Sequence, residues 1–217
     1  MIFNDPARLP DTGETPQVRF ARARALHGTL GEGYVARRGI PVELAHAQGL
    51  RFDPDYVGRP AVVAAMHDHA GALVALHGRY LQVQRGQDKM LTVGPGDGML
   101  GVGRGWRAEP LVLVEGLFDA LSLARCGWAA VASVGRWASW LPTVARGREV
   151  WLAFDNGRPG EALAEDYGAR LATARIRRLP PPGRAKDWNT ALVKRGAVVV
   201  RSWLDRHLSG PKPGAER

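Results

Sequence analysis

The chain has 217 residues, of which 45% are hydrophobic and 24% are charged, and these ordinary globular values exclude wholesale disorder. Cys126 is its only cysteine, which excludes an intramolecular disulfide and a zinc ribbon, and no apolar run approaches the ~18 residues of a membrane span. The net charge of +9 favours polyanionic partners such as nucleic acid, although most basic residues are arginine, a bias that a GC-rich genome also produces. No signal peptide is visible, so we expect a cytoplasmic protein that does not contact a membrane.

The N-terminal half predicts a small mixed α/β region over residues 18–109, behind a loosely ordered arm at residues 1–17. The spacing of apolar residues predicts three short helices, over residues 18–27, 31–38 and 41–47. Two β-rich runs joined by a turn at Gly71 predict a hairpin, with strands over residues 61–67 and 72–80. Glycine punctuates residues 94–105, where we expect loops and turns.

After Pro110, strands alternate with helices. The predicted strands cover residues 111–114, 129–133, 149–154 and 175–179. The predicted helices cover residues 116–126, 137–144, 160–174 and 198–208. This alternation predicts a parallel sheet with helices on both faces. We therefore expect a second domain over residues 110–195, a C-terminal helix within residues 196–209 and a disordered tail at residues 210–217.

Acidic residues follow two of the predicted strands. Glu115 comes directly after the first strand, Asp119 lies four residues later, and Asp155 follows the third strand. Ligands collect at the carboxyl ends of strands in such sheets, and neighbouring strand ends lie ~5–10 Å apart, so the three acids can share one site for Mg²⁺. The alternative is that both acids are structural: Asp155 would cap the following helix, and Glu115 would stabilise the first turn of its helix through the helix dipole. Spacing alone leaves both interpretations open.

Several motifs carry a resemblance to a known family. Leu111-Val-Leu-Val-Glu-Gly-x-x-Asp-Ala-Leu resembles the first motif of the Toprim domain, and Phe154-Asp-Asn-Gly-Arg-Pro-Gly160 resembles the second, whose usual form is Asp-x-Asp-x-x-Gly. Lys186-Asp-Trp-Asn189 resembles the element that often follows in the primase-like branch. Upstream, Gly28-Thr-Leu-x-x-x-Tyr34-x-x-x-Arg38-Gly-Ile40 resembles the N-terminal segment of Toprim primase-like proteins from phages, plasmids and integrated elements. The predicted hairpin with Gly78-Arg79-Tyr80, followed by Asp88-Lys89, resembles the nucleic-acid-binding subdomain of DnaG-like primases.

The resemblance implies an α/β primase core, in which a Toprim domain, a Rossmann-like parallel sheet with flanking helices, follows a smaller mixed α/β N-terminal subdomain. It implies that Glu115 is the general acid/base and a metal ligand, and that Asp119 and Asp155 hold Mg²⁺ or Mn²⁺. The residues that it implies for nucleic-acid or nucleotide binding are Arg38, Arg79, Lys89, Lys186 and Asp187. The implied partners are single-stranded DNA, nucleoside triphosphates, and a helicase or a separate zinc-binding or template-binding protein.

Two features depart from the family pattern. Gly157 stands where the second aspartate of Asp-x-Asp is usual, and Glu161 is a nearby acid that could replace it. A single cysteine also leaves no zinc-binding domain of the kind that replicative primases use to engage template. Two other functions therefore stay open beside primer synthesis: a metal-dependent Toprim nuclease, and a single-stranded nucleic-acid-binding module whose catalytic site has decayed.

Other side-chain groups have structural and functional interpretations. The arginines near the last predicted strand, at positions 175, 177, 178 and 184, form either a phosphate track with Lys186 or a solvated strand edge. His67 and His69 share a strand face with which His77 can pair, a pattern that more often marks exposed histidines than a transition-metal site. We expect Trp137, Trp140 and Trp151 to pack in the interior rather than to stack on bases.

Overall fold

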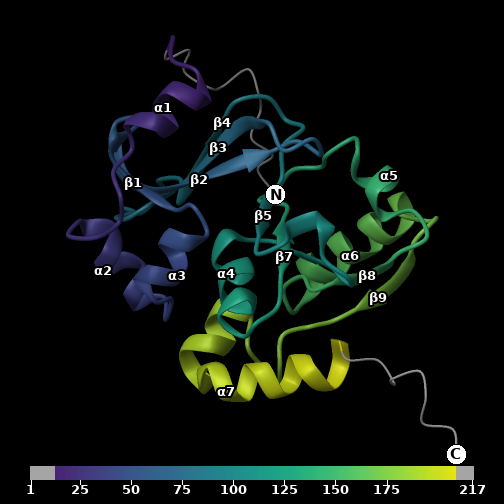
Figure 1. The fold of residues 1–217 in the computed structure, drawn as a ribbon. Helices are drawn as coiled ribbons and strands as arrows, with labels where there is room; N and C mark the ends of the chain where they lie inside the picture. The colour runs from purple at the N-terminus through teal and green to yellow at the C-terminus, as the bar shows by residue number, and fades with distance from the viewer. Residues whose placement is uncertain (1–12, 209–217) are drawn as a thin grey trace, which may run out of the picture.

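The computed structural model describes residues 13–208, which form two β-sheets with their helices (Figure 1). Residues 1–12 of the predicted arm and the whole of the predicted tail, residues 210–217, lie outside this range. The four-stranded sheet belongs to the N-terminal part of the chain and the five-stranded sheet to the C-terminal part. No helix among the described residues is long and apolar enough to cross a membrane.

The N-terminal region is an antiparallel sheet with short helices before it. The helices are α1 (Pro16–Arg22), α2 (Leu30–Arg37) and α3 (Val42–Ala47). The strands lie in chain order in the sheet and are β1 (Arg51–Tyr56), β2 (Arg59–His67), β3 (Leu73–Tyr80) and β4 (Met90–Val93). The predicted hairpin is thus β2 and β3, which pair antiparallel with Ala61 opposite Tyr80.

The structure departs from the sequence prediction at three N-terminal elements, α1, β1 and β4, and the prediction had no strand at the position of β4. α1 begins at Pro16, behind a Thr15 cap, and ends at Arg22, because Arg24 is already extended and forms a β-bridge with Phe52. β1 was not predicted, since Asp53-Pro54-Asp55 lies within it and these residues are rare in strands. Pairing with β2 supplies the hydrogen bonds that such a sequence does not favour on its own.

The C-terminal region is a mostly parallel sheet in the strand order β5-β7-β6-β8-β9. Its strands are β5 (Leu100–Val102), β6 (Leu111–Val114), β7 (Ala130–Ala132), β8 (Glu149–Leu152) and β9 (Arg175–Arg178). Its helices are the short 3-10 helix η2 (Gly105–Arg107), α4 (Leu117–Arg125), α5 (Leu141–Ala145), α6 (Arg158–Arg170) and α7 (Trp188–Leu208). This architecture confirms the predicted α/β fold class.

Two C-terminal elements differ from the prediction. β5 lies in the segment expected to be loop, and it pairs antiparallel with β7 at the edge of the sheet. β5 has only three residues and a central glycine, so its sequence looks the same as that of a turn. α7 begins at Trp188, ten residues before the predicted helix, and breaks at Gly196, whose φ is +79°. The predicted helix corresponds to the part after this break.

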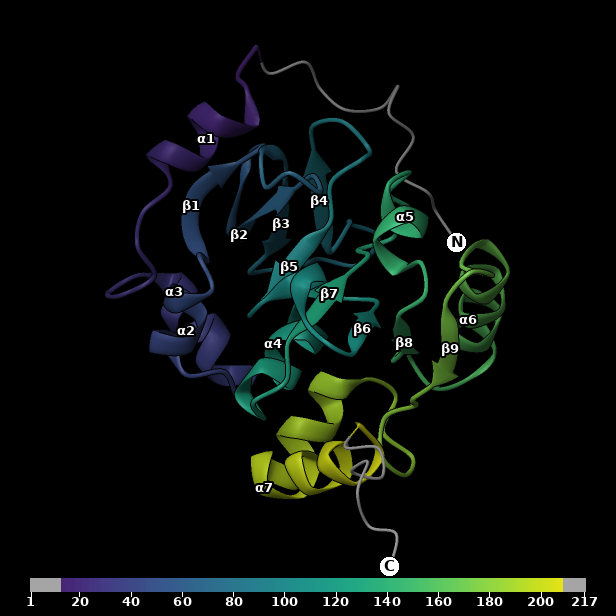
Figure 2. The ribbon, with the colours of Figure 1, turned by 45° about the vertical axis from the view of Figure 1, so that its right-hand side comes forward.

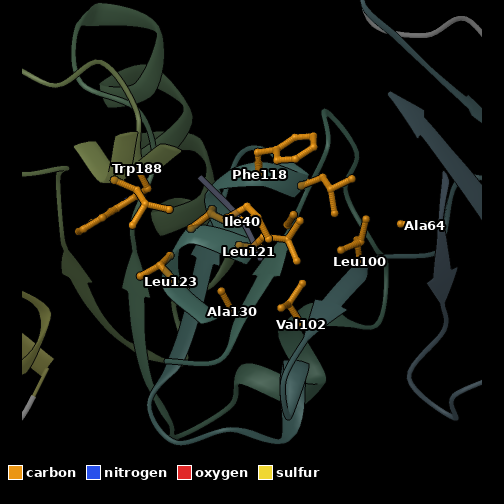
Figure 3. Packing of buried hydrophobic residues seen from close by; sticks show 14 of the residues in the cluster. Ile40, Ala64, Leu100, Val102, Phe118, Leu121, Leu123, Ala130 and Trp188 are labelled. Atoms are coloured by element: carbon orange, nitrogen blue, oxygen red, sulfur yellow. The ribbon is translucent and has the colours of Figure 1, made fainter. Parts of the chain in front are cut away.

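Helices cover both faces of the five-stranded sheet, because successive residues of each strand point to opposite sides. The helices α5 and α6 lie on one side of the sheet, and α4 and α7 lie on the other (Figure 2). Leu111 and Leu113 of β6 pack with α5 and α6, whereas Val112 and Val114 pack with α4 and α7. The cluster on the α4 side continues into the N-terminal region, where Ile40 and Ala64 belong to it (Figure 3). One continuous apolar core therefore joins the two regions and fixes their positions relative to each other.

Candidate active site

A cleft with a volume of about 790 Å³ opens between the N-terminal sheet and the carboxyl ends of β6 and β8. All of the site residues predicted from the sequence line it: Arg38, Arg79, Lys89, Glu115, Asp119, Asp155, Lys186 and Asp187. The arginines and Lys89 come from the N-terminal region, and the acids come from the sheet and helix ends of the C-terminal region. The structure thus brings these residues together, and their functional roles stay predictions.

Asp119 is held in the first turn of α4 with its carboxyl group in the cleft wall. Its Oδ1 accepts a hydrogen bond from the backbone N–H of Asn189 at 3.1 Å, which ties it to the start of α7. A Cβ at Gly116 would lie only 2.8 Å from Asp119 Oδ2. The glycine that precedes α4 therefore leaves room for this carboxylate.

Glu115 and Asp155 are joined across the ends of β6 and β8. Glu115 Oε1 accepts the backbone N–H of Asp155 at 2.9 Å, so the two strand-end residues are fixed side by side. The residue that caps α6 is Gly157, with no side-chain capping bond. The interpretation of Asp155 as a helix cap is therefore wrong, and its carboxyl group faces the cleft, 3.9 Å from Lys186 Nζ.

The loop that carries Asp155 is held by Arg178 of β9. The Arg178 guanidinium donates hydrogen bonds to the backbone oxygens of Leu152, Phe154 and Asp155, each at 2.8–2.9 Å. It also forms an ion pair with Glu161 at 2.8 Å. Arg178 thus anchors the loop. Glu161 is paired with Arg178 and does not line the cleft, so it does not replace the second aspartate of Asp-x-Asp.

The backbone explains why position 157 is glycine. Gly157 has φ +98° and ψ 173°, a region that only glycine adopts readily. An aspartate here would strain the turn between β8 and α6. The departure from Asp-x-Asp is therefore built into the local geometry of this loop.

Restoring the usual aspartate is expected to fail. Gly157→Asp should lower the free energy of unfolding by about 1–3 kcal/mol, the usual cost of a side chain in such a backbone conformation. The variant should not gain any metal-dependent activity, because the strained loop would displace the Asp155 carboxyl group. Chemical denaturation beside the wild type measures the first effect, and a variant of undiminished stability and higher activity would show that this position tolerates the acid.

Asp187 lines the cleft together with the other acids, whereas the resemblance assigned it to nucleic-acid or nucleotide binding. Its Oδ1 accepts the N–H of Thr190 at 2.6 Å in the first turn of α7, and buried Trp188 anchors the segment by donating to the backbone oxygen of Ala153. The Asp187 charge acts on both Asp119 and Asp155. The Lys186–Asn189 motif therefore adds a fourth carboxylate to the acidic side of the cleft.

Burial and neighbouring carboxylates make the acids hard to ionise together. Burial, followed by the charges of Asp187 and Asp155, raises the pKa of Asp119 to about 7. Burial, followed by the charges of Glu115 and Asp187, raises the pKa of Asp155 to about 7. A bound cation would relieve this repulsion, so the electrostatics of the cleft favour one.

The donor set fits a hard divalent cation. Carboxylate oxygens are the ligands that Mg²⁺ prefers, and one or two of them are enough when waters and substrate phosphates complete the shell. Within residues 13–208, no three histidine, cysteine, aspartate or glutamate side chains already converge as a metal-holding group. A cation held by one or two of the cleft carboxylates would complete its shell with waters or phosphate oxygens.

These pKa values predict a pH dependence of stability. Because Asp119 and Asp155 keep protons up to about pH 7 when folded and only up to about pH 4 when unfolded, the free energy of unfolding should fall as pH rises through that range. The Asp119→Asn/Asp155→Asn variant should lack this fall. Mg²⁺ should raise the melting temperature more at pH 8 than at pH 5.5, since protons compete for its ligands. If the free energy of unfolding changed with pH in the same way in the wild type and in the double variant, the prediction would be refuted.

His77 sits on the floor of the cleft as a neutral side chain. Burial, followed by the charges of Arg79 and Arg136, lowers the pKa of its ring to about 3. Its Nδ1 lies 3.0 Å from Thr92 Oγ1, which belongs to β4. The ring therefore has a structural partner.

Asn189 is a site residue that the sequence analysis did not assign. Its side chain accepts from Arg38 at 3.2 Å and donates to the Arg38 backbone oxygen and to Ser122 Oγ, while its N–H reaches Asp119. It thus connects the basic and acidic walls of the cleft. Its place in the Lys186–Asn189 motif was the signal available in the sequence.

Comparisons with known proteins agree with this architecture. A family profile for the Toprim domain matches residues 110–198, and a profile for a domain of unknown function (DUF7146) matches residues 13–105. No curated protein sequence matches the chain.

The fold is similar to that of solved primase structures. The zinc-binding and RNA polymerase domains of the Aquifex aeolicus primase match with a TM-score of 0.65 and 17% identity, over 93% of this chain and 63% of that one. The DnaG primase catalytic domain bound to single-stranded DNA matches with a TM-score of 0.61 and 19% identity, over 86% and 75%. The primase fragment of the bacteriophage T7 primase-helicase protein matches with a TM-score of 0.54 and 19% identity, over 77% and 73%.

The chain spans slightly less than two thirds of the length of the Aquifex structure. At these identities the likeness shows the fold, and the Toprim match covers the region that carries the acids. Residues 110–198 of the chain therefore match the Toprim domain, and the chain has a fold similar to that of DnaG-type primase catalytic domains.

Proposed function

We propose that this chain is a primase-type nucleotidyltransferase core, which makes short primers on single-stranded DNA with Mg²⁺ or Mn²⁺. The observation that carries this proposal is the composition of the cleft. Four carboxylates at the strand and helix ends of a Toprim sheet face cationic side chains from the N-terminal region across one cavity. Anionic nucleotides and a divalent cation are the ligands that such opposed walls would hold together.

Each wall has a distinct role in this proposal. Asp119 and Asp155 would hold the cation, which when bound would neutralise charge on the triphosphate and activate the attacking hydroxyl. Glu115, whose Oε1 accepts the Asp155 N–H, would accept the proton of that hydroxyl as it attacks the α-phosphorus and pyrophosphate leaves. Arg79 and Lys89 would guide the template or the nucleotide along the opposite wall.

Partners are part of the same proposal. One of the similar structures is a primase catalytic domain bound to single-stranded DNA, and another belongs to a primase-helicase protein. We propose single-stranded DNA and nucleoside triphosphates as ligands of this cleft. A helicase or a separate zinc-binding or template-binding protein would deliver the template.

A decayed catalytic site is the second candidate, and Gly157 favours it because a common acidic position is missing. In that case the protein would bind single-stranded DNA with a strong dependence on salt but without dependence on Mg²⁺.

The test is one denaturing gel. End-labelled single-stranded DNA and, in parallel, labelled nucleotides are incubated with the protein and Mn²⁺. New short products that need both template and nucleotides would support primer synthesis. Shortening of the labelled strand without nucleotides would instead identify a Toprim nuclease. An unchanged gel together with a positive band shift would identify a binding module and overturn the proposed synthesis.

A further inference from the structure

Two arginines of the cleft share one neutral hydrogen-bond acceptor. Arg38 donates from its terminal NH2 nitrogen to the Tyr34 hydroxyl at 3.2 Å, and Arg79 donates from Nε to the same oxygen at 3.2 Å. Arg38 follows the end of α2 and Arg79 lies on β3, so this hydroxyl brings together side chains from separate elements. Both arginines line the cleft, whereas Tyr34 itself is buried behind them.

The pair carries two positive charges that no carboxylate neutralises. Within residues 13–208, neither arginine has an acidic side chain within ion-pair distance. The other side-chain acceptor of Arg38 is the neutral Asn189 amide. An anion between two adjacent guanidinium groups relieves their mutual repulsion, and their planar donors suit phosphate oxygens. The arrangement therefore points to a phosphate ligand.

Packing fixes the tyrosine ring that holds this pair. Tyr34 contacts Phe118 of α4 edge to face, with ring centroids 5.6 Å apart, and the Arg38 guanidinium lies over the Phe118 ring at 5.1 Å. Asn189 joins Arg38 to Asp119 on the acidic wall. The hydroxyl thus stands at a fixed distance from the proposed cation site.

We propose that the Tyr34 hydroxyl is a positioning group that holds Arg38 and Arg79 side by side as one phosphate-binding pair facing the acids. The phosphates come either from the nucleotide or from the DNA backbone. The inference rests on the proposed function for its physiological ligand, but phosphate binding can be measured without any synthesis.

Tyr34→Phe is the test variant, because it removes the hydroxyl and keeps the ring. We expect the melting temperature to stay nearly unchanged, and the affinity for inorganic triphosphate or for single-stranded DNA to fall about tenfold by calorimetry. A loss for triphosphate alone would assign the pair to the nucleotide. A loss for DNA, with a shallower salt dependence, would assign it to the backbone.

Tyr80→Phe is the matched control. Tyr80 neighbours Arg79 on β3 but points to the other face of the sheet, where the Arg59 guanidinium lies over its ring. Tyr80→Phe should leave the affinities for inorganic triphosphate and for single-stranded DNA unchanged.

A double-mutant cycle separates positioning from a general effect on the fold. In an Arg79→Ala background, Tyr34→Phe should cost clearly less than it does in the wild type, because one of its two partners is gone. Equal costs in both backgrounds would overturn the proposal. So would unchanged affinities in Tyr34→Phe, or a wild-type protein that binds neither triphosphate nor DNA. Absence of primer synthesis with intact phosphate binding would count against the proposed function and leave this site standing.

Discussion

Replacing Glu115 with glutamine is expected to reduce template-dependent primer synthesis by a factor of about 100 or more. Glutamine keeps an Oε1 that can accept the Asp155 N–H, so the strand-end connection should persist. What is lost is the negative charge that would accept the proton of the attacking hydroxyl, and a positioned base contributes about 10²–10⁴ in rate. The measurement is the initial rate of labelled-nucleotide incorporation at saturating Mn²⁺.

Glu149→Gln is the matched control for this variant. Glu149 begins β8 at the opposite end of the sheet, where it pairs with Arg177 at 3.1 Å and does not line the cleft. Its replacement should leave the rate within about a factor of two, as surface changes usually do. A Glu115→Gln protein as fast as this control would show that Glu115 is not the proton acceptor.

Replacing Gly160 with alanine is expected to lower the free energy of unfolding by about 2–4 kcal/mol and to abolish divalent-cation binding. A Cβ at this position would lie 2.0 Å from the backbone oxygen of Asp155 and 2.8 Å from its carbonyl carbon. Backbone atoms cannot swing aside as a side chain can, so the loop that carries Asp155 would have to move. That shift would also break the bond from Arg178 to the Asp155 oxygen.

Gly168→Ala separates this clash from the general effect of removing a glycine. Gly168 lies in the same helix, α6, and its Cβ would meet nothing within 4 Å. Alanine there should stabilise the protein by about 0.5–1 kcal/mol through helix propensity. Chemical denaturation and Mn²⁺ titration of both variants make the comparison. Equal stability of the two would show that the turn at Asp155 is not tightly constrained.

The fold was largely predictable because its strongest signals are local. Leu111–Val114 is an uninterrupted apolar run, and the helices after it have a 3.6-residue period, so the alternation of strand and helix could be read directly. β1 and β5 could not be predicted in this way. β1 contains Asp-Pro-Asp, and β5 has three residues with a central glycine, so each becomes a strand only by pairing with its neighbour. Tertiary pairing overrode weak or contrary local preference in both.

The acids of the site followed from a topological rule, whereas their supports did not. The ends of parallel strands meet at one edge of a sheet, which is why Glu115 and Asp155 could be expected together. The contact between Arg38 and Asn189 joins residues 151 positions apart, and the shared hydroxyl of Tyr34 depends on where α2 docks against β3. The pairing of Glu161 with Arg178 likewise depends on how α6 lies against β9. Sequence spacing carries no information about such contacts.

The most direct test of the cation site is the anomalous diffraction of Mn²⁺ in crystals of the wild-type protein grown with a non-hydrolysable nucleoside triphosphate. We expect a Mn²⁺ peak within about 2.2 Å of a carboxylate oxygen of Asp119 or Asp155, with the triphosphate between that ion and the arginine wall. A bound nucleotide whose Mn²⁺ touches none of the four cleft carboxylates would contradict this assignment of the site.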